Sequence, residues 1–192
     1  INGEADGDRS GWSVSLSSDG NVLAIGAPYN DGNGREAGHV RVHEYRSGGW
    51  TQRGGDIDGI AHDQYVSDDY DYTGWLVSLS SDGNVLAIRA FDEKNGSYVR
   101  VYEYGTLGWT GRGGALYGEV FNDRFGYSLS LSKDGDVLAI GAPYNDGGNG
   151  QNAGHVRVYQ YNGSPYTASP HFKPTSSPTG ITHSTMPTQA QS

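Results

Sequence analysis

Hydrophobic and polar positions alternate with a period of two near the start of the chain. In residues 13–17, Val14 and Leu16 share one side and the serines the other, which predicts a half-buried strand. The Asp-Gly pair at residues 19–20 predicts a tight hairpin turn, because glycine tolerates the positive φ that such a turn requires. Residues 22–27 are almost all apolar, as expected of a central strand that is covered on both faces.

Two further strands complete this unit. A loop rich in Gly, Asn and Asp leads to residues 39–45, where Val40 and Val42 form an inward side. Residues 50–57 are more polar and predict a fourth strand at an outer edge. Four antiparallel strands in succession, with no helical periodicity, predict one blade of a β-propeller.

The pattern then recurs along the chain. The first two strands of the unit match at residues 12–28, 75–91 and 127–143, and the third strand at residues 39–45, 98–104 and 155–161. A single blade cannot bury both of its faces, so its neighbours must stack on it. The sequence therefore predicts an all-β fold, a partial β-propeller of about three four-stranded antiparallel blades. The approximate bounds of the blades are residues 1–57, 58–116 and 117–163.

The chain after residue 163 has a different composition. Residues 164–192 are dominated by Ser, Thr and Pro, and such a segment cannot bury enough apolar area to offset its loss of conformational entropy. We expect a disordered tail or an extended stalk. Closed propellers have about 4–8 blades. Three blades therefore favour either further blades of the same longer chain or self-association.

Composition and net charge limit the classes of partner that the chain is expected to bind. The formal net charge is -9, so phosphate backbones and anionic lipid would be repelled, and we expect no nucleic acid partner. No apolar run approaches the roughly 18–20 residues that cross a bilayer, so we expect no direct membrane insertion. There are no cysteines, which excludes thiolate catalysis and cysteine-ligated zinc.

Two short elements carry a family resemblance. Phe125-Gly126 is followed by Gly141-Ala142-Pro143, and the first unit keeps Gly11 and the second element at residues 26–28. Departures from this pattern in the second unit are Thr73, Arg89 and Phe91. The chain resembles the FG-GAP repeat family, which includes the integrin α-chain-like propellers.

The resemblance implies a binding or adhesion scaffold, extracellular or at the cell surface, without catalytic activity. A protein or glycan ligand would be recognised through the inter-blade loops. One alternative is an enzyme that acts on polysaccharide with the propeller as its scaffold, although no Gly-x-Ser-x-Gly nucleophile turn is present. The other alternative is a structural repeat protein that assembles through its unpaired edges.

Metal sites of the family are not expected here. Many members carry a calcium loop between the first two strands, whereas this chain has only the short turn at residues 17–21 and its repeats. One or two carboxylates cannot supply the six to eight oxygens that calcium prefers. His39 and His155 recur, but Tyr98 replaces them in the second unit, which argues against a histidine metal site. We expect no cofactor, and at most weak Ca²⁺ binding.

Two sets of loop residues are candidates for ligand binding, because binding residues concentrate in loops on rigid scaffolds. The connection before the second unit is longer than that before the first and gathers carboxylates and tyrosines: Asp63, Tyr65, Asp68, Asp69, Tyr70, Asp71 and Tyr72. The second set recurs with the blade: Asn30, Asp31, Asn145 and Asp146. The alternatives are a solvated acidic loop for the first set and plain turn geometry for the second.

Overall fold

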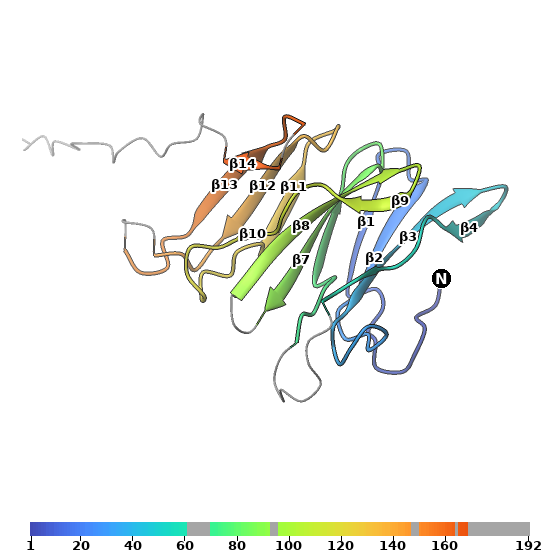
Figure 1. Cartoon of the computed structure of the whole chain (residues 1–192), viewed down its shortest axis with the longest axis horizontal. Helices are drawn as coiled ribbons and strands as arrows, with labels where there is room; N and C mark the ends of the chain where they lie inside the picture. Colours follow the sequence, from blue (N-terminus) through green and yellow to red (C-terminus); the bar gives the residue numbers. More distant parts are fainter. Residues whose placement is uncertain (61–69, 93–95, 147–149, 164, 169–192) are drawn as a thin grey trace, which may run out of the picture.

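The computed structural model describes residues 1–60, 70–92, 96–146, 150–163 and 165–168. These residues form strands and turns arranged as three antiparallel sheets side by side, as Figure 1 shows. No helix occurs among them, and hence none with the length and hydropathy of a membrane span. The predicted all-β fold of stacked blades is confirmed.

Each sheet follows the predicted order of strands. The first contains β1 (Ser13–Leu16), β2 (Val22–Ala27), β3 (His39–Arg46), β4 (Gly49–Gln52) and β5 (Ile57–Asp58). The second contains β6 (Leu76–Leu79), β7 (Val85–Asp92), β8 (Gly96–Gly105), β9 (Gly108–Gly111) and β10 (Leu116–Tyr117). The third contains β11 (Ser128–Leu131), β12 (Val137–Ala142), β13 (His155–Gln160) and β14 (Thr167–Ala168).

The fourth strand of the first blade differs from the prediction. In place of one strand over residues 50–57, β4 and β5 pair separately with the two halves of β3. The interruption contains Gly54, whose φ of 84° turns the chain away from the ladder. The second blade repeats this break between β9 and β10, around Gly113 with a φ of 99°.

The third sheet continues beyond the expected boundary at residue 163. Strand β14 pairs with β13 through Thr167 and Ala168, and the Tyr166 side chain is buried. Residues 164 and 169–192, where we expect a disordered tail, lie outside the described residues.

The middle sheet provides both layers of the core, because its strands send alternate side chains to the two neighbouring sheets. Leu86 and Ile88 pack in a cluster with Val40 and Val42 of the first sheet. Val85, Ala87, Val99 and Val101 pack in a second cluster with Leu138, Ile140 and Tyr159 of the third sheet and with the fully buried Phe125.

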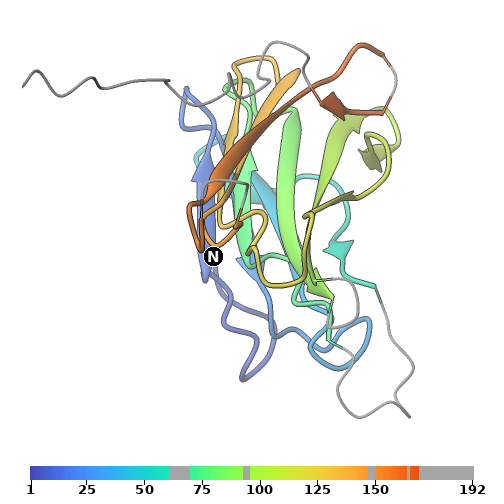
Figure 2. The same ribbon diagram turned by 90° about the vertical axis from the view of Figure 1, so that its left-hand side faces the viewer.

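The first strands of the three sheets, β1, β6 and β11, lie together and are joined by hydrogen bonds. The backbone N–H of Leu79 donates to the Ser15 hydroxyl at 2.9 Å, and that of Ser81 donates to the Lys133 carbonyl at 3.1 Å. Figure 2 shows the stack from the side, with the third sheet nearest the viewer. The Gly/Asn loops and the connections between blades gather at one end of the stack, the lower end in Figure 1.

Candidate ligand-binding pocket between the second and third blades

A buried aspartate fixes each connection between blades. In the third unit, Asp123 accepts backbone hydrogen bonds from Glu119 and Phe125, both at 3.0 Å. Asp8 and Asp71 hold the same position in the other two units, and both are buried. A buried carboxylate that accepts several hydrogen bonds holds its loop firmly, because losing them would leave a desolvated charge.

The residue after each aspartate has a left-handed backbone, which turns its side chain over the loop end. Arg9, Tyr72 and Arg124 have φ values of 54°, 46° and 52°. The Arg9 guanidinium lies 4.1 Å from the ring centre of Tyr29, and that of Arg124 lies 4.5 Å from the ring centre of Tyr144. These cation–π contacts hold two arginines at the mouths of two loop pockets.

The larger pocket has a volume of about 480 Å³ and lies where the second blade meets the third. Strand β7 of the second blade, the connection at residues 120–124 and the loop after β12 all contribute to it. We call it the inter-blade pocket; its principal lining residues are Arg89, Phe91, Phe121, Arg124, Tyr144 and Asp146.

Arg89 brings a buried cation to this pocket. It stands at the position that glycine occupies in the other two units, and it is almost fully buried. Its Nη2 donates to the Ser97 hydroxyl at 2.9 Å and its Nε to the Phe125 carbonyl at 3.4 Å. Burial, assisted by the nearby charge of Arg124, lowers the pKa of Arg89 to about 10. Arg89 therefore remains charged at neutral pH.

The opposite wall carries an acid and two amides. Asp146 Oδ1 accepts the backbone N–H of Asn152 at 2.8 Å, and the Asp146 side chain is exposed. Gln151 and Asn152 also line the pocket. The rings of Phe91 and Phe121, 5.8 Å apart between centres, form its apolar side. The pocket thus combines two guanidinium groups, amides and an aromatic surface.

The first blade has a smaller equivalent, which we call the first-blade pocket. Its volume is about 290 Å³, and Arg9, Tyr29 and Asp31 stand where the inter-blade pocket has Arg124, Tyr144 and Asp146. Here the remaining wall includes the acidic Asp6 and Glu36. Arg35 is a second arginine of this pocket, but three carboxylates face its two guanidinium groups, whereas the inter-blade pocket has one carboxylate and two guanidinium groups.

The recurring loop residues fall into two groups. Asp31 and Asp146 are exposed and line the two pockets. Asn30 and Asn145 are buried instead: their side-chain amides donate to Asp8 Oδ2 at 3.0 Å and to a Glu119 carboxylate oxygen at 3.2 Å. The aspartates thus line the pockets, while the asparagines hold the loops in place.

The long connection before the second blade is described in part. Asp63, Tyr65, Asp68 and Asp69 lie outside the described residues. Asp71 is fully buried, and it accepts hydrogen bonds from the Tyr98 hydroxyl, from the Thr73 hydroxyl at 2.8 Å and from the backbone N–H of Ile60 at 2.7 Å. Its carboxylate therefore faces the protein interior and not the loop surface.

Tyr70 and Tyr72 belong to an aromatic cluster at the junction of the first two blades. Their ring centres are 5.4 Å apart, and Tyr72 also contacts Tyr29 at 5.4 Å and Trp75 at 5.9 Å. Burial, with a hydrogen bond to Glu36, raises the pKa of Tyr72. Tyr72 is therefore a neutral packing residue at physiological pH.

One group in the described part of the chain could offer ligands to a metal ion. Glu4, His39 and Asp56 place one ligand atom each within 4.8 Å of one another. Arg41 competes for this group, because its Nη1 lies 3.1 Å from Glu4 Oε1. We propose no metal site there.

Sequence reasoning missed several residues that line the inter-blade pocket. The main ones are Arg89, Phe91, Phe121, Arg124 and Tyr144. A signal was available for two of them, since Arg89 and Phe91 are departures from the repeat pattern. Where one blade departs from a residue type that the other blades share for packing, a requirement other than that packing determines the residue.

The stacked sheets define a protein of the β-propeller class. The model of the FG-GAP repeat matches residues 2–42 and 119–159, the first and third units up to their third strands. The chain therefore carries FG-GAP repeats, as the resemblance predicts. No curated protein sequence matches the chain.

Solved structures share the fold at low sequence identity. The yeast Saccharomyces cerevisiae Sqt1 is 15% identical, with a TM-score of 0.51 over 86% of this chain and 36% of its own. The Pseudomonas aeruginosa periplasmic gluconolactonase PpgL is 17% identical, with a TM-score of 0.50 over 78% of this chain and 39% of its own. A putative 6-phosphogluconolactonase from Bacteroides uniformis is 13% identical, with a TM-score of 0.49 over 82% of this chain and 38% of its own. The chain thus spans less than two-fifths of the length of these structures.

These comparisons correct one expectation. The family resemblance implies a scaffold without catalytic activity, yet the fold is shared with a protein named as a gluconolactonase. Stacked blades of this kind therefore occur in enzymes, and the propeller fold is no ground for excluding catalysis. The prediction that the protein is not an enzyme is withdrawn.

Proposed function

We propose that this chain is a recognition module whose inter-blade pocket binds a glycan that carries a carboxylate group. The observation that supports this most strongly is the presence of two arginines, Arg89 and Arg124, on one pocket. The chain as a whole is acidic, with a net charge of -9, so it does not attract anions in general. A local concentration of positive charge within it therefore favours the binding of one specific anionic group.

The chemistry of the pocket suits a sugar acid. A guanidinium group binds a carboxylate through two parallel hydrogen bonds, and the Arg124 side chain is exposed at the pocket mouth. Asp146 and the amides of Gln151 and Asn152 offer partners for hydroxyl groups, while Phe91 and Phe121 offer an apolar surface for a sugar ring. A volume of about 480 Å³ lies in the range of small-ligand sites.

An extracellular or cell-surface setting follows as part of the same proposal. FG-GAP repeats are typical of extracellular proteins, and acidic glycans are found there. A protein partner that presents an acidic side chain would contact the same two arginines. The binding experiment distinguishes such a partner from a glycan.

The test is calorimetric titration with a short uronic-acid oligosaccharide, compared with a neutral oligosaccharide of the same length. We expect Arg124→Ala to weaken binding of the acidic sugar by about tenfold or more, the loss of one charge-assisted interaction. Arg9→Ala is the matched control, because Arg9 makes the same cation–π contact in the first-blade pocket. Mass analysis of the sugar after incubation reports whether it is also turned over.

Equal binding of the two oligosaccharides, or equal losses in the two variants, would contradict the proposal. Binding of an acidic peptide but of neither sugar would assign the pocket to a protein partner.

A further inference from the structure

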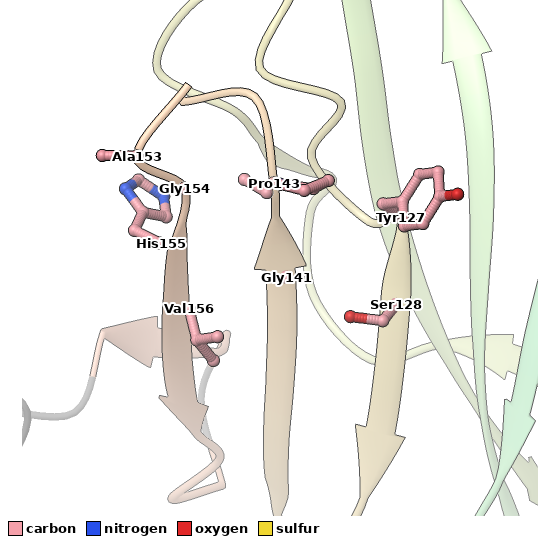
Figure 3. Close-up of a pocket in the computed structure, with 9 residues that line it drawn as sticks. Tyr127, Ser128, Gly141, Pro143, Ala153, Gly154, His155 and Val156 are labelled. Carbon is pink, nitrogen blue, oxygen red and sulfur yellow. The ribbon is translucent and has the colours of Figure 1, made fainter. Parts of the chain in front are cut away.

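The outer face of the third sheet carries an open socket of about 360 Å³, drawn in Figure 3. Strands β11, β12 and β13 line it, together with the segment that leads into β13. The Ser128 hydroxyl points toward β12, and His155 and Val156 lie on the opposite side (Figure 3). His155 Nε2 is buried and has no hydrogen-bond partner among the described residues.

The first sheet has the same socket, and there it is filled. The connection of the second blade, Thr73-Gly74, lies in it: Ser13 Oγ donates to the Gly74 carbonyl at 2.8 Å, and the Thr73 N–H donates to the Ala37 carbonyl at 2.9 Å. A Cβ atom at Gly26 or Gly38 would overlap the backbone of this segment. Both glycines are therefore required by the occupant of the socket.

The socket of the third sheet keeps every one of these residues. Ser128, Gly141, Ala153 and Gly154 are of the same types at the same repeat positions. The surrounding apolar face is also kept but uncovered: Val40 beside the filled socket is 0% exposed, whereas Val156 beside the open one is 65% exposed. The third sheet therefore presents an intact docking face with nothing on it among the described residues.

A matching segment is exposed at the other end of the stack. Ser10-Gly11 stands where Thr73-Gly74 stands in the second unit. The strand that follows, β1, has Leu16 at 56% exposure, whereas its counterpart Leu79 in the second blade is 7% exposed. The described residues thus carry an open socket on the third blade and an uncovered segment of the matching sequence type before the first strand.

We propose that the socket of the third blade binds the Ser10-Gly11 connection and the β1 face of a second copy of this chain. The Ser128 hydroxyl would then donate to the partner copy's Gly11 carbonyl, as Ser13 does to Gly74 within the chain. The interface is head to tail, so it joins two different surfaces and allows a ring to close.

A second copy suits the geometry better than closure of the three described blades on themselves. Three blades are fewer than the about four that the smallest closed propellers contain, so the first and third described blades do not meet. Two copies of these blades supply six, which is within the range of about 4–8 for closed rings. Each socket and each free connection would then be used once.

The test is the mass of the full chain in solution, by light scattering on a sizing column over a range of concentrations. We expect twice the 20.5 kDa chain mass at the higher concentrations. Leu16→Glu and Val156→Glu place a charge on the two exposed faces, and each variant alone should give the single-chain mass. Leu107→Glu is the control: Leu107 is also apolar and is 89% exposed, more than Leu16 or Val156, but it lies in the β8–β9 turn, away from both faces.

Mixing the two variants separates a head-to-tail contact from a symmetric one. The Val156→Glu chain keeps its first-blade face, and the Leu16→Glu chain keeps its socket, so the mixture should regain the doubled mass through one intact interface. This recovery also shows that both variants are folded. A wild-type chain that stays at 20.5 kDa at its highest soluble concentration, or a single variant that keeps the doubled mass, would overturn the proposal.

Discussion

Buried aspartates explain how loops rich in glycine hold a fixed shape at the pocket end of this protein. Asp8, Asp71 and Asp123 each accept backbone N–H groups of their own connection, and each is followed by a residue with a left-handed backbone. The sequence marks Asp71 only as a candidate ligand-binding residue of the long connection, and it does not set these aspartates apart from exposed ones. Their burial could not be predicted, because it depends on contacts between segments that are distant in the sequence.

The first prediction concerns Asp71. Asp71→Asn keeps the shape of the side chain but removes one acceptor, so one of its three hydrogen-bond donors is left unpaired in a buried position. We expect a loss of about 1–3 kcal/mol in the free energy of unfolding. Urea denaturation measures it. Asp6→Asn, on an exposed aspartate, should stay within about 0.5 kcal/mol of wild type.

The second prediction concerns pH and the hairpin turns. Asp19 accepts from the Ser17 hydroxyl at 2.6 Å and from the backbone and side-chain N–H groups of Asn21 at 3.0 Å, and these bonds lower its pKa from 3.8 to about 2. Because the folded pKa lies below the unfolded one, the contribution is complete above pH 3.8 and is lost as the pH falls toward about 2.

Urea midpoints measured across that pH range check the second prediction. The wild-type midpoint should fall as Asp19 is protonated, and Asp19→Asn should reduce the slope. A slope that Asp19→Asn leaves unchanged would show that the carboxylate is not hydrogen-bonded in the folded turn.

At the level of strands, the internal repeat allowed the fold to be predicted from the sequence. Alternation of apolar residues and the Asp-Gly turns predicted the first three strands of every blade, and Gly20 has the expected positive φ, 72°. The fourth strand was predicted as continuous, but paired glycines divide it into β4 and β5. Periodicity could not reveal this, because glycine does not itself fix the direction in which a chain turns.

The break in the fourth strand allows an arginine to join neighbouring blades. Arg112, just after β9, donates to the Gly135 carbonyl at 3.1 Å and to Asp136 at 2.7 Å, and its guanidinium lies 3.7 Å from the ring centre of Tyr161. Arg53 makes the same kind of contact from the first blade to the second, at Gly83. These arginines connect the outer strands of one blade to the hairpin turn of the next.

The third prediction follows from this contact. Arg112→Ala should cost about 1–3 kcal/mol of unfolding free energy, because it removes the hydrogen bonds to Gly135 and Asp136 and a cation–π contact at a side chain that is only 8% exposed. Arg46→Ala is the control, since the Arg46 side chain is 70% exposed and its ion pair with Glu44 should contribute little. Equal losses in thermal or urea unfolding would refute a role for Arg112 in joining the blades.

In the molecule as a whole, the proposed glycan binding depends on which loops the stacking brings together. The sequence located the recurring loops with Asp31 and Asp146, and both line pockets. It could not indicate that Arg89 of the second blade and Arg124 of the next connection would share one pocket. That arrangement depends on the packing between blades, whereas the periodicity of the sequence predicts only the strands within one blade.

Each sheet of this protein is stabilised by the neighbour that covers it. The three sheets offer an internal test, because Leu-Ala-Ile recurs at residues 23–25, 86–88 and 138–140 with the same pairing to the third strand. Only the middle copy is covered by a sheet on both faces. Hydrogen exchange followed by mass spectrometry, at low protein concentration, compares the exchange rates of these three segments. Because the segments have the same sequence, a difference in rate reports on coverage by the neighbouring sheets.

We predict that residues 86–88 exchange most slowly, because the outer two sheets open without unfolding the middle one. If residues 86–88 exchanged as fast as residues 23–25 and 138–140, or faster, stacking between blades would not be the source of stability.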